Sequence, residues 1–266
     1  MKPAFNTIMA GLNKRLSHKD NGLLAQLWDI TNQHAYFHCI SKIALGRKSC
    51  LNNRHLKEFL YLGHLSRHCL GIRSILFDHQ RDVHSLSNVI KYIENNSHAL
   101  IFKNFKNNPI PGESAVETRS RFAKFCEIDP SLLQDETQIP ITVLSHLSDR
   151  VNAARSEFGP FINSNFAYRK PFGNDDGKTW NQLDDALLEC WSIFLHLNLL
   201  ISNSSISPLG FTESDILYKL DLPAIDKDID YSFFERDVHK IVAGFYDRYS
   251  LGNIKLATPH RLRAST

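Results

Sequence analysis

Residues 53–95 of the chain read NRHLKEFLYLGHLSRHCLGIRSILFDHQRDVHSLSNVIKYIEN. The first half of this stretch places apolar side chains three or four residues apart, which is the spacing of one helix face. The polar run at 78–82 interrupts the pattern, and a second apolar series follows from Leu86 to Ile93. The sequence therefore predicts a long core helix that ends near Phe77, a charged corner and a shorter helix. The expected buried stripe of the long helix is Phe59, Leu62, Leu65, Cys69, Ile72 and Leu76.

Three other stretches carry helical spacing, and each has its own boundary signal. Gly46 follows the first, at about 22–45, and glycine favours the end of a helix. The second starts after Pro140, and Gly159-Pro160 is expected to stop or kink it. Thr179 can cap the third. Their stripes are Leu23, Leu27, Ile30, His34, Phe37 and Ala44; Leu144, Leu147, Val151, Ala154 and Phe158; and Leu183, Leu187, Cys190, Phe194, Leu197 and Ile201.

Shorter elements are expected around these helices. Ser114 and Glu117 have capping-box spacing, which predicts a helix that runs to about Cys126. Asp129-Pro130 is expected to open one more turn. The stretch at 95–112 carries no regular pattern.

No alternating strand pattern of useful length is present, so the sequence predicts an all-α protein. The simplest arrangement is a four-helix up-down bundle with additional short helices. We assign 1–20 to a loosely ordered N-terminal lead-in, 21–204 to the bundle and 205–266 to a C-terminal helical extension packed on it. The extension is expected to hold helices at 212–220 and 231–249.

Composition limits the class of protein. The chain has 266 residues, of which 42% are hydrophobic and 22% charged, as in ordinary globular proteins. The first hundred residues hold 13 Lys and Arg against 6 Asp and Glu, and nine of the 13 histidines. This basic half either faces nucleic acid or is a solvated helix surface.

The cysteines and apolar runs bear on the compartment. The five cysteines are an odd number without a CxxC pair, which predicts reduced thiols. The N-terminal sequence has no sustained apolar segment of the kind found in secretory signals. The longest apolar run, 187–201, contains Glu189, His196 and Asn198 and is too short and polar to span a bilayer. We therefore expect a cytoplasmic protein without a membrane partner.

Two matched histidine pairs form the first candidate site. His34 and His38 lie four residues apart on one predicted helix, and His64 and His68 do so on the next. Histidines at this spacing share a helix face and can bind one metal ion. Because a short loop makes the two helices antiparallel neighbours, a four-histidine site is one hypothesis. The alternative is that these are core and boundary histidines without a ligand.

Arg73 and His79 form the second candidate, since an Arg can stabilise a phosphoryl transition state and a His can act as acid or base. Residues Asn163, Tyr168 and Arg169 form the third, on a short segment before an acidic glycine turn. By residue type alone, a helix end with a capping Asn and an aromatic side chain packed on the bundle explains the third group better. There is no glycine-rich phosphate loop and no GxSxG motif, so no cofactor is expected.

Two segments of the chain resemble a known family. The first is LGIRSILFDHQRDVHSLSNVIKYI at 70–93, and the second is FINSNFAYRKPFGNDDGKTWNQLDDALLECWSIFLHL at 161–197. Together they resemble the landmarks of HEPN-superfamily proteins in the abortive-infection, AbiU-like branch. The similarity covers about residues 23–200.

This resemblance implies a helical bundle, commonly a homodimer, and in many members a metal-independent ribonuclease. In that alignment the family's conserved Asn falls on Asn163 and its Ala on Ala167. Its catalytic Arg falls on Ile162, and its catalytic His falls on Tyr168. Isoleucine cannot bind phosphate, and a tyrosine with an ordinary pKa near 10 is a poor general base at neutral pH.

The sequence supports three hypotheses about function. The first is an HEPN-like binding or regulatory protein, acting as a homodimer in a phage-defence, toxin–antitoxin or RNA context, without the standard ribonuclease chemistry. The second is an enzyme, a divergent metal-independent endoribonuclease that uses Asn163, Tyr168 and Arg169, or Arg73 and His79. The third is a metal-binding bundle with a histidine cluster.

Overall fold

The computed structural model describes residues 4–44, 54–77, 84–162 and 180–202, together with 206–207, 239–240, 243–244 and 247–248. Within these ranges the regular elements are helices joined by turns and loops, and the β-type pairing there is an isolated bridge between Ile101 and Gln138. The expected all-α class is confirmed for this part of the chain. The helices are α1 (Phe5–Ser17), α2 (Leu23–Ala44), α3 (Arg54–Phe77), α4 (Leu86–Asn96), α5 (Phe102–Asn107), α6 (Ala115–Cys126), α7 (Ile141–Ile162) and α8 (Trp180–Asn198), with 3₁₀ turns η1 (Ser97–Ala99) and η2 (Pro130–Leu132).

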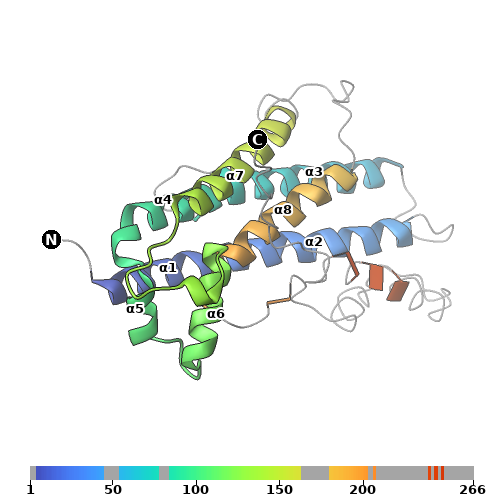
Figure 1. Cartoon of the computed structure of the whole chain (residues 1–266). Helices are drawn as coiled ribbons and strands as arrows, with labels where there is room; N and C mark the ends of the chain where they lie inside the picture. The colour runs from blue at the N-terminus through green and yellow to red at the C-terminus, as the bar shows by residue number, and fades with distance from the viewer. Residues whose placement is uncertain are drawn as a thin grey trace, which may run out of the picture.

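The four longest helices, α2, α3, α7 and α8, lie side by side (Figure 1). Helix α3 packs against the other three, and α8 packs against α2, α3 and α7. Helices α1 and α4 pack on each other and on one end of this group, beside the smaller α5–α6 pair (Figure 1). The interior between α2, α3 and α8 is therefore enclosed by three long helices.

Helix α3 is described as far as Phe77, and its predicted residues Leu65, Cys69, Ile72 and Leu76 are buried. Phe59, in contrast, is 72% exposed, so its assignment to the buried stripe is wrong. At about 100° per residue, two successive steps of three place Phe59 about 120° away from Leu65 around the helix axis. The buried face of this part of α3 instead includes a histidine, His68, which is 1% exposed.

The stripes of α7 and α8 are confirmed, including the burial of Leu183, Leu187, Phe194 and Leu197, except for Ile201, which lies beyond the end of α8 and is half-buried. Helix α7 nevertheless continues through Gly159-Pro160 to Ile162, so the predicted stop is wrong. Proline has a helical φ and removes only one hydrogen bond, and the buried Phe158 anchors the turn before it.

The N-terminal segment also differs from the expectation. Residues 5–17 form helix α1 rather than a loosely ordered lead-in. Ile8, Leu12 and Leu16 lie four residues apart and are fully buried. Tyr92 of α4 fixes the helix in place, because its hydroxyl donates to the Ile8 carbonyl at 3.2 Å. This spacing is a helical pattern, but the polar residues Asn13, Lys14 and Arg15 separate Leu12 from Leu16.

The short elements follow from local chemistry. The Ser114 hydroxyl accepts the Glu117 N–H at 3.2 Å, and the Glu117 carboxylate accepts the Ser114 N–H at 2.7 Å. This confirms the predicted capping box of α6. Asp129 opens η2 by accepting the Ser131 N–H at 2.7 Å. Helix α5 was not predicted, although Phe102 anchors it in the core.

Several expectations fall outside the described residues, among them the Thr179 cap, the helix at 212–220 and the boundary between 204 and 205. The described pairs within 231–249 are helical. Among the described helices, none combines the length and apolar character that a bilayer crossing requires.

Candidate metal centre

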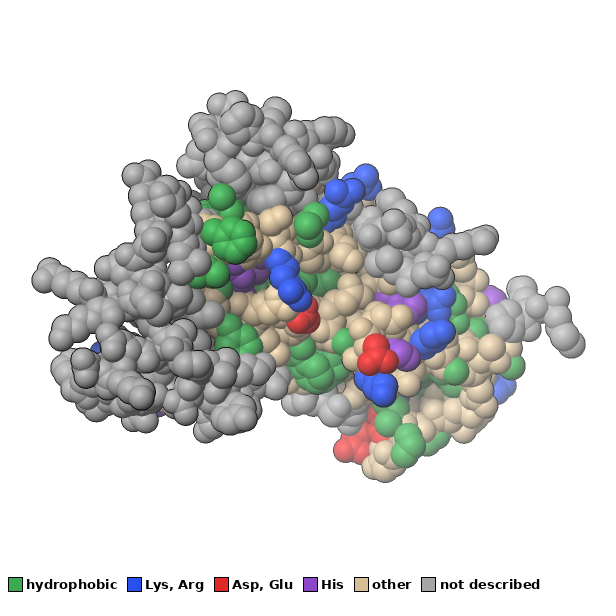
Figure 2. Space-filling model, turned by 180° about the vertical axis from the view of Figure 1, so that it is seen from behind, with side chains coloured by type: hydrophobic (Ala, Val, Ile, Leu, Met, Phe, Trp, Pro, Cys, Tyr) green, Lys and Arg blue, Asp and Glu red, His purple; other side chains and the backbone are tan. Residues whose placement is uncertain are grey.

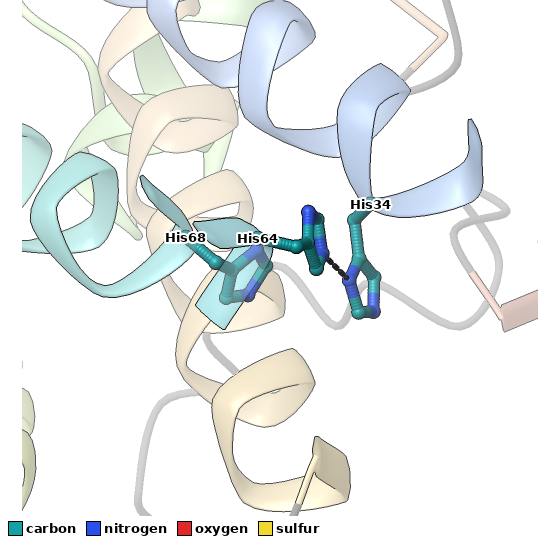
Figure 3. Close-up of side chains that lie close together, drawn as sticks. All are labelled: His34, His64 and His68. Atoms are coloured by element: carbon teal, nitrogen blue, oxygen red, sulfur yellow. Dashed lines mark hydrogen bonds between the residues drawn. The ribbon is translucent and has the colours of Figure 1, made fainter. Parts of the chain in front are cut away.

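Helices α2 and α3 bring the two predicted histidine pairs together. His34 and His38 come from α2, and His64 and His68 come from α3. The His34 Nδ1 atom lies 3.0 Å from the His64 Nε2 atom. Figure 3 shows His64 and His68 on one helix turned toward His34 on the other. The two histidine pairs, each at i, i+4 spacing, form one cluster because they lie at the same level of the packed helices.

Three of these side chains form a convergent donor set. One nitrogen from each of His34, His64 and His68 lies within 4.8 Å of the other two. Four nitrogens at about 2.0–2.1 Å around a tetrahedral zinc ion are separated by about 3.3 Å. The 3.0 Å between His34 Nδ1 and His64 Nε2 is close to this value.

His38 is placed differently from its three neighbours. Its Nε2 atom lies 3.2 Å from His34 Nε2, on the imidazole edge opposite the one that faces His64. The two rings of α2 are perpendicular, with centroids 4.5 Å apart. The four histidines predicted from the sequence are thus in contact, but the structure divides them between the two edges of His34.

The cluster is held in its neutral form by its surroundings. Burial, reinforced by the neighbouring His38 and Arg248, lowers the pKa of His34 to about 3. Burial and the adjacent histidines lower the pKa of His64 to about 2, and burial is again the main reason that the pKa of His68 falls to about 3. The neutral imidazole is the form that binds metal. At neutral pH these rings therefore do not need to lose a proton before they coordinate an ion.

Helix α8 supplies a carboxylate that sequence reasoning missed. Asp184 Oδ1 lies 2.5 Å from His34 Nε2, and its side chain is 6% exposed. Its other oxygen, Oδ2, pairs with Arg248 Nη1 at 3.1 Å. Asp184 lies seven residues, two helical turns, before the fully buried Trp191, and this register was the signal that it faces inward.

An aromatic ring and two thiols also lie on the helices that carry the cluster. The Phe37 ring stacks on His64 with centroids 4.0 Å apart and an interplanar angle of 9°. Cys39 and Cys69, which directly follow histidines in the sequence, are buried. Burial raises the pKa of the Cys69 thiol to about 12, so this thiol stays protonated and does not join the imidazoles as a thiolate ligand.

The structure does not assemble the ribonuclease candidates. Arg73 is exposed on α3, and its proposed partner His79 lies outside the described residues. Asn163, Tyr168 and Arg169 lie outside them as well, so both assignments stay predictions. On the face shown in Figure 2, the described Lys and Arg side chains are spread among hydrophobic, uncharged and acidic groups.

Within the described ranges, the set formed by His34, His64 and His68 is the one group of three or more potential metal ligands that converges in this way. The chain matches no protein-family model, no curated protein and no solved structure. The chemistry of this cluster therefore has to be derived from its own geometry.

Proposed function

We propose that this protein is a metal-binding helical protein that holds one divalent transition-metal ion between α2 and α3, with His34, His64 and His68 as ligands. The observation that carries the proposal is the convergence of their three nitrogens within 4.8 Å in a cluster of neutral rings, of which His34 and His68 are buried and His64 is half-buried. Two helices that share one ion are linked at that point, so binding is expected to stabilise the fold.

The proton inventory of the cluster supports an ion. A neutral imidazole carries one N–H and one lone pair. When the His34 proton resides on Nε2, beside the Asp184 carboxylate, the Nδ1 atom presents a lone pair toward His64. Without an ion, a His64 proton has to fill that contact. A metal ion accepts lone pairs from both rings at once. A proton between the two nitrogens instead makes one ring the donor and the other the acceptor.

The donor set also limits the class of ion. Imidazole nitrogens suit zinc, copper, nickel and iron, whereas calcium and magnesium prefer oxygen ligands. Three histidines leave the fourth tetrahedral position of a zinc ion open to water or another side chain. We therefore propose Zn²⁺ as the ion and use Co²⁺ as its spectroscopic substitute.

The test is a Co²⁺ titration of chelator-treated, full-length protein, followed by visible absorption, with competition by Zn²⁺ and elemental analysis of the purified protein. One equivalent of Co²⁺ with the intense bands of a tetrahedral site is expected. His64→Gln and His68→Gln should abolish these bands. His18→Gln is the matched control, because His18 accepts only an exposed backbone N–H, that of Asp20. Wild-type protein without stoichiometric binding would remove the proposal.

The resemblance to HEPN-like proteins supports a second proposal, that of an all-α binding or regulatory module arranged as an up-down bundle and acting as a homodimer on RNA or a protein partner. The mutual packing of α2, α3, α7 and α8 supports the bundle. Its enzymatic form is a metal-independent endoribonuclease. RNA cleavage with chelator present, measured beside the mass in solution, separates the proposals: cleavage by a dimer without metal supports the second and gives the histidine cluster no catalytic part.

A further inference from the structure

The two edges of the His34 imidazole face different chemistry. His34 Nδ1 lies 3.0 Å from His64 Nε2, and His34 Nε2 lies 2.5 Å from Asp184 Oδ1 and 3.2 Å from His38 Nε2. Because two lone pairs repel at 2.5 Å, the contact with the carboxylate oxygen favours a proton on Nε2. A carboxylate that accepts the outer N–H of a metal-binding histidine fixes its tautomer and orients the ring. Asp184 comes from α8, so a third helix acts on a donor set that α2 and α3 supply.

We propose that Asp184 is the positioning residue of the metal centre: it holds the His34 proton on Nε2, which leaves Nδ1 as the ligand atom. This inference rests on the proposed function for its ligand, Zn²⁺, but its tautomer component applies to the metal-free protein.

Arg248 makes the assignment sharper. Its Nη1 donates to Asp184 Oδ2 at 3.1 Å, while Oδ1 faces His34. A carboxylate can accept on both sides, but an asparagine amide has one oxygen and one NH₂ group. Because a guanidinium only donates, an asparagine at 184 turns its oxygen to Arg248 and its NH₂ to His34. That NH₂ then requires a lone pair on Nε2 and moves the His34 proton to Nδ1, the atom that has to bind the ion.

The experiment compares Zn²⁺ and Co²⁺ affinities of the wild type, Asp184→Asn and Asp184→Asn/Arg248→Met. Loss of an outer-shell partner weakens metal binding by about 10- to 100-fold, and we expect Asp184→Asn to reach this range. The double variant should recover a measurable part of the loss, because without Arg248 the amide oxygen is free to accept from His34. A double variant weaker than Asp184→Asn would overturn the role given to Arg248.

Asp185→Asn is the matched control. Asp185 is adjacent on α8, is 67% exposed at its side chain and also pairs with Arg248, at 3.2 Å. Its replacement removes the same charge and should change the affinity by less than about threefold, since it has no contact with His34 among those described. Equal losses in Asp184→Asn and Asp185→Asn would show a general charge effect and would overturn the positioning role.

A second readout needs no metal. Long-range ¹H–¹⁵N NMR of the chelated protein reports the tautomer of each histidine, and His34→Gln identifies the His34 signals. We expect His34 as the Nε2–H tautomer in the wild type and in Asp185→Asn, and as the Nδ1–H tautomer in Asp184→Asn. Wild-type protein with the Nδ1–H tautomer would overturn this inference even if the ion binds. The expected tautomers without any ion binding would instead remove the proposed function alone.

Discussion

Two buried polar regions of the molecule differ in how their hydrogen-bond donors and acceptors are paired. At one end, Arg121 of α6 and Glu113 form a bidentate ion pair at 2.6 and 2.9 Å, with both side chains 2% exposed. Arg121 Nη1 also donates to the Leu199 and Leu200 carbonyls just after α8, and Glu113 accepts from Thr118. Every strong donor in this network meets an oxygen acceptor.

In the histidine cluster, nitrogen atoms are paired with nitrogen atoms. The contact between His34 and His64 joins two nitrogens of neutral rings, and His38 approaches His34 from the other edge through a further nitrogen. Each of these contacts therefore uses one N–H and one lone pair of two neutral rings, with no charged group between the nitrogens. The first region pairs opposite charges, whereas in the second neutral nitrogens meet, and the proposed metal ion would bridge those nitrogens.

The largest expected loss of unfolding free energy comes from breaking the Arg121–Glu113 ion pair. Arg121→Met leaves the Glu113 carboxylate buried without its cation, and removing one partner of a buried ion pair costs about 3–5 kcal/mol. Urea unfolding of the chelated protein measures this loss. Glu113→Gln/Arg121→Met is expected to recover part of it, because the unpaired charge is gone. A single variant within about 1 kcal/mol of the wild type would mean that this network does not hold α6 to the end of α8.

Leu187→Ala shows, for comparison, how much unfolding free energy a buried apolar side chain contributes. Leu187 is fully buried in α8, and truncating such a side chain costs about 2–5 kcal/mol through lost burial and the cavity that remains. The same urea unfolding experiment measures it. Val116→Ala is a suitable control, since Val116 is 77% exposed and its truncation should change the unfolding free energy by less than about 0.5 kcal/mol.

His64→Leu is the corresponding change in the cluster. In chelator it should cost at most about 1–2 kcal/mol, because it removes a hydrogen bond between neutral groups rather than half of an ion pair. The wild type should gain about 2.7 kcal/mol when free Zn²⁺ is one hundred times its Kd, and the variant should gain almost nothing. A variant that gains as much as the wild type would place the ion elsewhere.

These two regions also show how far the sequence predicts the molecule. Periodicity placed α2, α3, α7 and α8, and i, i+4 spacing identified the four histidines. Asp184 was missed because a carboxylate on a helix usually faces water, and its role depends on the packing of α8. Arg248 lies 64 residues further along the chain, and the level at which α2 meets α3 depends on side-chain packing that no single helix pattern records.

In metal-free protein, the two regions should also affect the stability of the fold in different pH ranges. Burial is the main cause that lowers the pKa of His34, His64 and His68 well below 6.5 in the folded protein. Below pH 6.5 the unfolded chain therefore binds protons that the folded chain does not. Stability therefore falls as the pH decreases from 6.5 toward 5, by about 1.4 kcal/mol per pH unit for each proton taken up.

Glu113 acts in a lower window. Burial alone would raise its pKa, but hydrogen bonds from Arg121 and Thr118, together with the Arg121 charge, hold it below its ordinary 4.5. Its contribution is present above pH 4.5 and is lost as the pH falls through the folded-state value. Urea unfolding at pH 5–6.5 should show a shallower slope in His64→Leu than in the wild type, and an unchanged slope in Glu113→Gln/Arg121→Met. Equal slopes in the wild type and His64→Leu would contradict the neutral cluster.

His38→Gln carries the smallest expected effect and tests the division of the cluster. His38 meets the Nε2 edge of His34, on the side of Asp184, while the proposed ligand atoms gather at the Nδ1 edge. If the ion sits at the Nδ1 edge, His38 is not a ligand, and Co²⁺ affinity should change by less than about threefold with the same visible bands. A ligand loss would instead weaken binding as much as His68→Gln does and alter the band pattern. That outcome would mean that His38 turns to complete a four-histidine site, so that α2 contributes two ligands, as its i, i+4 pair first indicated.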